Sequence, residues 1–120
     1  MDKRQDPLKD LKVRTKRFAL SVIGMLKGVK RTPESDVLGK QIIRSATSVG
    51  ANYRSACRAR SQAEFFAKLS ITVEECDETL FWLELIEEAE IYNEPPMEIL
   101  KSETTQILMV LSTARKTVSK

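Results

Sequence analysis

Apolar and small neutral residues recur at intervals of three and four along most of the chain, in four segments separated by short interruptions. An α-helix has about 3.6 residues per turn, so this spacing gathers such residues into one stripe along each helix. Amphipathic helices of this kind bury their stripes against one another. The spacing therefore predicts four helices packed around a shared core.

The stripe of the first segment consists of Leu8, Leu11, Thr15, Phe18, Val22, Met25 and Val29. The second consists of Leu38, Ile42, Ser45, Val49, Tyr53 and Ala56. The third consists of Phe66, Leu69, Val73, Cys76, Leu80 and Leu83. The fourth consists of Met97, Leu100, Thr104, Ile107, Leu111, Ala114 and Val118.

The interruptions place the helices at about residues 7–30, 34–59, 62–92 and 96–118. Pro33 lacks a backbone donor and suits only a turn or the first turn of a helix. The start of the third helix is marked by Ser61 and Glu64, which have the spacing of a capping box. In that motif the hydroxyl and the carboxylate accept hydrogen bonds from amides left free at a helix start.

Short connections bring consecutive helices alongside one another, which predicts an all-α fold, an antiparallel up-down four-helix bundle. The length of 120 residues and the mass of 13.6 kDa fit a single domain over residues 1–120. An extended coiled coil is the alternative architecture, and the separate breaks argue against it.

The chain contains no histidine, which removes the usual general base near neutral pH and the commonest zinc ligand. Cys57 and Cys76 do not belong to a metal-ligand spacing, and no glycine-rich phosphate loop is present. The acidic residues of the third helix are expected to form a solvated flank. We therefore expect no enzyme activity, no metal, no cofactor and no small-molecule substrate.

No apolar run approaches the roughly 20 residues that cross a bilayer, so no membrane association is expected. The segment 1–10 is charged and has no apolar signal core. These features favour a cytoplasmic location.

Charge differs in sign between the two halves of the sequence. Residues 1–60 hold 15 Lys and Arg against 5 Asp and Glu, a balance of +10, whereas residues 61–120 hold 5 against 12, a balance of −7. Mutual neutralisation along packed helices is one interpretation. The other is a basic face that binds a polyanion.

Basic residues of the second helix fall in a narrow sector opposite its core stripe: Lys40, Arg44, Arg54 and Arg58. Small residues lie between them on the same face: Thr47, Ala51 and Ser55. Arginine forks bind phosphate oxygens in pairs, so this face is a candidate for nucleic-acid binding through the backbone. The alternative is a solvated face, or salt bridges to acids of the third helix in the same or a neighbouring chain.

A second set of apolar residues projects away from the predicted core stripes. Its members are Leu20 and Ile23 on the first helix, and Ile71, Trp82, Leu85 and Ala89 on the third. Apolar residues gathered on one outer face are typical of a contact surface. We therefore predict that these residues form an oligomer interface, with a ligand or a different protein as the alternative occupant.

Three segments carry a resemblance to a known family: residues 41–56, 64–71 and 74–85, with Ser48 and Asn52 at the expected positions. The chain resembles the four-helix-bundle family named for proteins encoded in intervening sequences of bacterial 23S ribosomal RNA. The resemblance implies a ring-like homopentamer without enzyme activity. A more distant similarity is to the accessory protein of diversity-generating retroelements, which works with a reverse transcriptase and nucleic acid.

The chain departs from the family pattern in two features. Many members have proline where this chain has Gly50, and an acid-glycine pair where it has Ser55 and Ala56. Arg44 matches the family motif, and its place implies pairing with a third-helix acid such as Glu74 or Glu75. Such pairing competes with phosphate binding.

The leading hypothesis is a non-enzymatic oligomeric scaffold that binds nucleic acid, RNA rather than DNA, through the basic face of the second helix repeated around the oligomer. The alternative is a protein-interaction or accessory module in which nucleic acid has no role.

Overall fold

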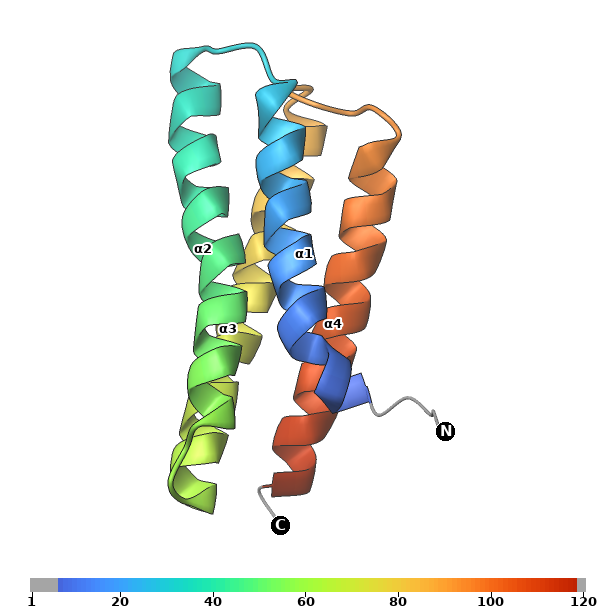
Figure 1. Ribbon diagram of the computed structural model, residues 1–120. Coiled ribbons are helices and arrows are strands. Elements are labelled where there is room, and N and C mark those ends of the chain that lie inside the picture. Colours follow the sequence, from blue (N-terminus) through green and yellow to red (C-terminus); the bar gives the residue numbers. More distant parts are fainter. Residues whose placement is uncertain (1–6, 119–120) are drawn as a thin grey trace.

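The computed structural model describes residues 7–118, with side chains described from residue 11 onward. This part of the chain forms four helices: α1 (Pro7–Lys27), α2 (Pro33–Cys57), α3 (Gln62–Glu88) and α4 (Pro96–Val118). Consecutive helices run in opposite directions, and α1 lies beside both α2 and α4 (Figure 1). The predicted antiparallel four-helix bundle is confirmed.

Local hydrogen bonds fix where α2 and α3 begin. Thr32 caps α2, and its hydroxyl accepts from the Ser35 amide at 3.0 Å while the Ser35 hydroxyl accepts from the Thr32 amide at 2.8 Å. Ser61 caps α3 as predicted, because its hydroxyl accepts from the Glu64 amide at 3.0 Å. The Glu64 carboxylate accepts from the Arg60 amide, one residue before the position expected for a capping box.

The third helix ends at Glu88, four residues before the predicted end at residue 92. Glu90 adopts a left-handed conformation with φ of 61°, and the Ile91 amide donates to the Ile86 carbonyl at 3.0 Å. The Glu90 amide donates to the Glu87 carbonyl, which completes a Schellman motif. The early end turns Ile91 and Tyr92 back against the core.

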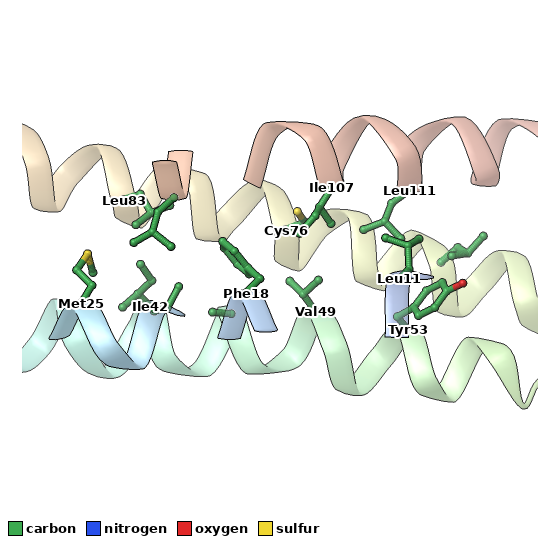
Figure 2. Packing of buried hydrophobic residues seen from close by; sticks show 14 of the residues in the cluster. Leu11, Phe18, Met25, Ile42, Val49, Tyr53, Cys76, Leu83, Ile107 and Leu111 are labelled. Carbon is green, nitrogen blue, oxygen red and sulfur yellow. The ribbon is translucent and has the colours of Figure 1, made fainter. Parts of the chain in front are cut away.

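The core contains buried side chains from all four helices, and Figure 2 shows them meeting between the helices. Most positions of the stripes predicted for α1, α2 and α4 are buried, while Leu38 and Val118 are half-buried and Leu8 lies outside the range of described side chains. Val29 is half-buried beyond the end of α1 at Lys27, three residues before the predicted end. Buried threonines satisfy their hydroxyls within their own helices: Thr15, Thr72, Thr79 and Thr104 donate to the carbonyl four residues earlier. Polar residues are therefore accommodated in this core without unpaired donors.

The predicted stripe of α3 is wrong at Phe66 and is displaced at Val73 and Leu80, which are only half-buried. Phe66 is 36% exposed, whereas Thr72, Thr79 and Ile86 are buried. This helix carries apolar residues on several sides, so a projection of the sequence alone does not define a single face. Packing against both α2 and α4 decides which residues are buried.

Candidate nucleic-acid interface

The structure places the four predicted basic residues of α2 on its outer surface. Lys40, Arg44, Arg54 and Arg58 are all exposed, while Val49 and Tyr53 of the same helix are buried. The sequence projection therefore assigned these residues to the correct side of α2. It did not determine what lies beside each of them.

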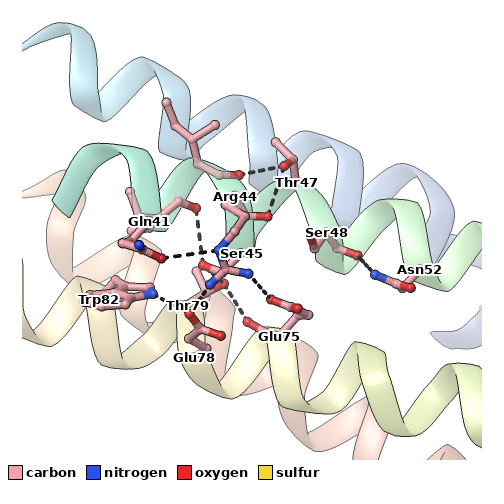
Figure 3. A network of polar contacts seen from close by, with 12 residues as sticks. Gln41, Arg44, Ser45, Thr47, Ser48, Asn52, Glu75, Glu78, Thr79 and Trp82 are labelled. Carbon is pink, nitrogen blue, oxygen red and sulfur yellow. Dashed lines mark hydrogen bonds and ion pairs between the residues drawn. The ribbon is translucent and has the colours of Figure 1, made fainter. Parts of the chain in front are cut away.

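Arg44 is engaged by the neighbouring helix (Figure 3). Its guanidinium donates to Glu75 at 3.1 Å and also to Glu78, two acids one turn apart on α3. The Gln41 side chain accepts a further hydrogen bond from Arg44 at 3.3 Å. The pairing implied by the resemblance is thus present with Glu75, and Glu78 takes the place suggested for Glu74.

The other cations of this face have a different environment. The side chains of Lys40, Arg54 and Arg58 form no hydrogen bond or ion pair with any residue whose side chain is described. Arg54 lies in the last turns of α2, and Arg58 is its C-terminal cap residue. These two arginines are therefore the members of the predicted stripe best able to bind phosphate oxygens in pairs.

A buried polar contact lies beneath Arg44 and joins the same two helices. The Thr79 hydroxyl lies 2.9 Å from the Ser45 hydroxyl, and both residues are fully buried. Asn52, one of the motif positions, donates to the Ser48 carbonyl at 2.9 Å. These contacts fix α2 against α3 and stabilise its own backbone, so they support the outer face without belonging to it.

The predicted interface residues lie in two environments. Leu20 is 59% exposed, Ile71 is 42% exposed and Ala89 is also exposed. Ile23 and Leu85 are half-buried. Trp82 packs partly against the core and its indole donates to Glu78 at 2.9 Å, so it does not project fully outward as the sequence analysis expected.

Other exposed apolar residues were missed by the sequence analysis. Phe81 on α3 is 50% exposed, and Ile99 and Met109 on α4 are 69% and 64% exposed. The exposed side of α4 from residue 99 to residue 113 holds no charged side chain; it consists of Ile99, Ser102, Thr105, Gln106, Met109 and Thr113. A signal was available, since these six positions hold no charged residue in the sequence itself.

A groove of about 910 Å³ runs between α1 and α4 next to this uncharged surface. Gly24 borders it, and a Cβ added there would meet no atom of another helix within 4 Å. The walls combine apolar residues such as Phe18 and Ile99 with the charged groups of Arg17 and Glu103. The groove is open to solvent along its length and suits a partner surface better than an enclosed small ligand.

The two cysteines differ in reactivity. Cys76 is buried between α3 and α4, and burial together with the negative charge of Asp77 raises the pKa of its thiol to about 12. A thiol with this pKa is neutral near pH 7 and is neither a nucleophile nor a metal ligand there. Cys57 is exposed at the end of α2. No three metal-ligating side chains converge in the described part of the chain.

Among the described residues, no helix is long and apolar enough to cross a membrane.

Comparisons with known proteins agree with the fold. The sequence model of the 23S rRNA-intervening sequence protein family matches residues 9–113. A crystal structure of a protein of unknown function from Bacteroides thetaiotaomicron, assigned to the S23 ribosomal protein family, is 34% identical with a TM-score of 0.81. The match covers 91% of this chain and 97% of that one. No functionally curated protein matches the chain.

Proposed function

The chain belongs to the 23S rRNA-intervening sequence protein family, and we propose that it is a non-enzymatic, self-associating helix bundle that binds RNA. In this proposal the RNA contacts are made to the phosphate backbone by exposed cations, and self-association repeats these contacts on one assembly. The resemblance to the family implies five copies, a number that the experiment below measures directly.

The observation that carries the RNA-binding proposal is the environment of Arg54 and Arg58. Both are exposed on α2, and neither is paired with any side chain among residues 11–118. Arg44, by contrast, is already bound by Glu75 and Glu78. A phosphate that binds Arg54 or Arg58 displaces water only, whereas one that binds Arg44 must also break two ion pairs.

Two surfaces support the self-association proposal. The exposed positions of α4 between residues 99 and 113 hold no charged residue and include Ile99 and Met109, and the cores of protein interfaces are typically depleted of charge. On α3, Phe81 and Ile71 are about half exposed. α3 and α4 are adjacent helices, so these two surfaces lie on neighbouring sides of one copy.

Self-association strengthens a weak phosphate site. Two arginines per copy neutralise few phosphates, but several copies engaging one RNA multiply the contacts through effective concentration. Each neutralised phosphate also releases counterions, so the binding weakens steeply as salt is raised. Contacts of this kind carry little sequence information.

The test measures mass by light scattering, with and without a double-helical RNA hairpin, at about 50 mM and about 200 mM salt. We expect a stable oligomer that gains RNA mass at the lower salt and loses it at the higher. A double variant, Arg54→Gln and Arg58→Gln, is expected to keep the oligomeric mass and lose most of the RNA.

The possible outcomes separate the parts of the proposal. A monomeric mass contradicts self-association, and an oligomer that gains no RNA at low salt contradicts RNA binding. In the second case the protein-interaction module becomes the better account. Dissociation of the double variant into smaller species would place the two arginines in a subunit contact rather than in an RNA site.

A further inference from the structure

Positive and negative side chains gather at opposite ends of the bundle. The comparison of residues 1–60 with residues 61–120 does not reveal this separation. One end contains the start of α1, the end of α2, the start of α3 and the end of α4 (Figure 1). The basic half, as we call it, comprises residues 11–17, 47–74 and 105–118. It holds ten Lys and Arg against two Asp and Glu, a formal charge of +8.

The remaining acidic half comprises residues 18–46 and 75–104. It holds six Lys and Arg against twelve Asp and Glu, a formal charge of −6. Two helices begin and two end at each end of an up-down bundle, so the helix dipoles largely cancel there. The difference between the two halves therefore comes from the side chains.

All four helices supply the basic half with cations. Arg54, Arg58 and Arg60 come from α2 and the connection after it, Lys68 comes from α3, and Arg115 and Lys116 come from α4. The start of α1 adds four more, of which Arg14 is paired with Glu103 at 2.7 Å. The two acids of this half, Glu64 and Glu74, cannot neutralise such a number.

Lys40 provides an internal comparison. It lies on the same face of α2 as Arg54, is also exposed, and also has no partner among the side chains described. It is fourteen residues from Arg54, or about 21 Å along a helix. That separation exceeds the Debye length of about 8 Å at physiological salt, so each cation responds to the charges of its own half.

We propose that double-helical RNA docks on the basic half, at the end of the bundle where α2 leads into α3, and that the acidic half takes no part in binding. The inference rests on the RNA binding proposed above. The proposed docking surface is made by several helices and replaces the predicted stripe along α2. This surface excludes Lys40 and includes Arg115. Repulsion between RNA phosphates and the acidic half would orient the bundle end-on.

The experiment compares charge reversals of equal size at different places. Arg54→Glu and Lys40→Glu each change the net charge by two, on the same face of the same helix. A third variant, Arg115→Glu, tests the basic half from α4. Binding to the RNA hairpin is measured by fluorescence anisotropy across a salt series, with circular dichroism and light scattering to confirm folding and assembly.

We expect Arg54→Glu and Arg115→Glu each to weaken binding about tenfold or more. Each should also lower the slope of log affinity against log salt concentration by about one for every protein copy that contacts the RNA. Lys40→Glu is expected to change the affinity less than about threefold. Equal losses from Lys40→Glu and Arg54→Glu, or no loss from Arg115→Glu, would overturn the docking surface while leaving RNA binding intact. Absence of binding by the unaltered protein at low salt would instead overturn the proposed function.

If Arg115→Glu fails to fold, Lys68→Glu on α3 replaces it. Lys68 belongs to the basic half but lies outside the predicted stripe of α2. A loss of binding in this variant supports the multi-helix surface. Unchanged binding confines the contact to α2 and contradicts the inference.

Discussion

The first and second halves of α2 carry similar side chains on their outer faces but differ in how these are engaged. In the first half, Arg44 is bound by Glu75 and Glu78, and Ser45 contacts Thr79. In the second half, Arg54 has no partner among the described side chains. The difference originates in α3, where Glu75 and Glu78 lie beside the first half of α2 and only the acids Glu64 and Glu74 precede Glu75 in that helix.

The contrast between Arg44 and Arg54 shows that the residues facing a cation from the neighbouring helix decide whether it is paired, since Lys40 in the first half also has no described partner. The part of α3 beside the second half of α2 contains Glu64 and Lys68 as its only charged residues before Glu74. Arg54 and Arg58 therefore face a segment with little negative charge. Three predictions test this contrast.

The largest expected effect is a difference in thiol labelling between the exposed end of α2 and the core beneath. Cys57 is exposed, whereas Cys76 is buried and burial raises the pKa of its thiol to about 12. Labelling of Cys76 requires opening of the bundle, and an opening free energy of about 4 kcal/mol slows it about 10³-fold. Iodoacetamide labelling followed by mass spectrometry measures both rates.

The matched control is the Cys57→Ser variant, which leaves one thiol and should label slowly until denaturant is added. Comparable rates for the two native thiols would mean that the packing of α3 against α4 near Cys76 is loose. Glu75 and Glu78 would then not be held in place beside Arg44. The contrast between Arg44 and Arg54 would lose its structural basis.

A smaller effect concerns stability. Arg44→Glu removes two ion pairs and places a third carboxylate beside Glu75 and Glu78, so the free energy of unfolding should fall by about 1 kcal/mol. Arg54→Glu breaks no contact with a described side chain and should change the free energy of unfolding by less than about 0.5 kcal/mol. Urea unfolding monitored by circular dichroism measures both values.

Arg44→Gln serves as the control, because it removes the charge without adding repulsion and should fall between the other two. If Arg54→Glu were as destabilising as Arg44→Glu, the second half of α2 would have a charged partner in the assembled protein. Such a result would favour subunit contacts at Arg54 over RNA binding.

The sequence was sufficient for the bundle and for the outer side of α2, because both follow from helical periodicity within single helices. It was insufficient for Phe66, since α3 packs on two neighbours and has no single apolar face. Whether Arg44 is paired depends on Glu78, which is 34 residues away in the sequence, and thus on the register between α2 and α3. Periodicity within one helix holds no information about that register.

The charge pattern illustrates the same limit on a larger scale. Counting charges in residues 1–60 and 61–120 contrasts the first two helices with the last two. The antiparallel topology brings the end of α2 and the end of α4 to the same end of the bundle, so the relevant division runs across every helix (Figure 1). This division becomes visible only once the chain direction of each helix is known.

The smallest expected effect concerns the two glycines inside α2, one in each half. A methyl group added at Gly39 would have its nearest contact at 3.8 Å with the flexible end of Leu26. One added at Gly50 would lie 3.4 Å from the Thr15 hydroxyl, which is held by a 2.6 Å hydrogen bond to the Leu11 carbonyl. Both distances are ordinary contacts, but the second neighbour has less freedom to move.

Alanine is favoured over glycine in a helix by about 1 kcal/mol. We therefore expect Gly39→Ala to raise the free energy of unfolding by about 0.5–1 kcal/mol, and Gly50→Ala by less, up to about 0.5 kcal/mol. Urea midpoints of the two variants and the unaltered protein give the comparison. A loss of stability in Gly50→Ala alone would show that α1 packs more tightly on the second half of α2 than these distances indicate. Contacts with α1, rather than contacts with α3, would then fix the position of this half.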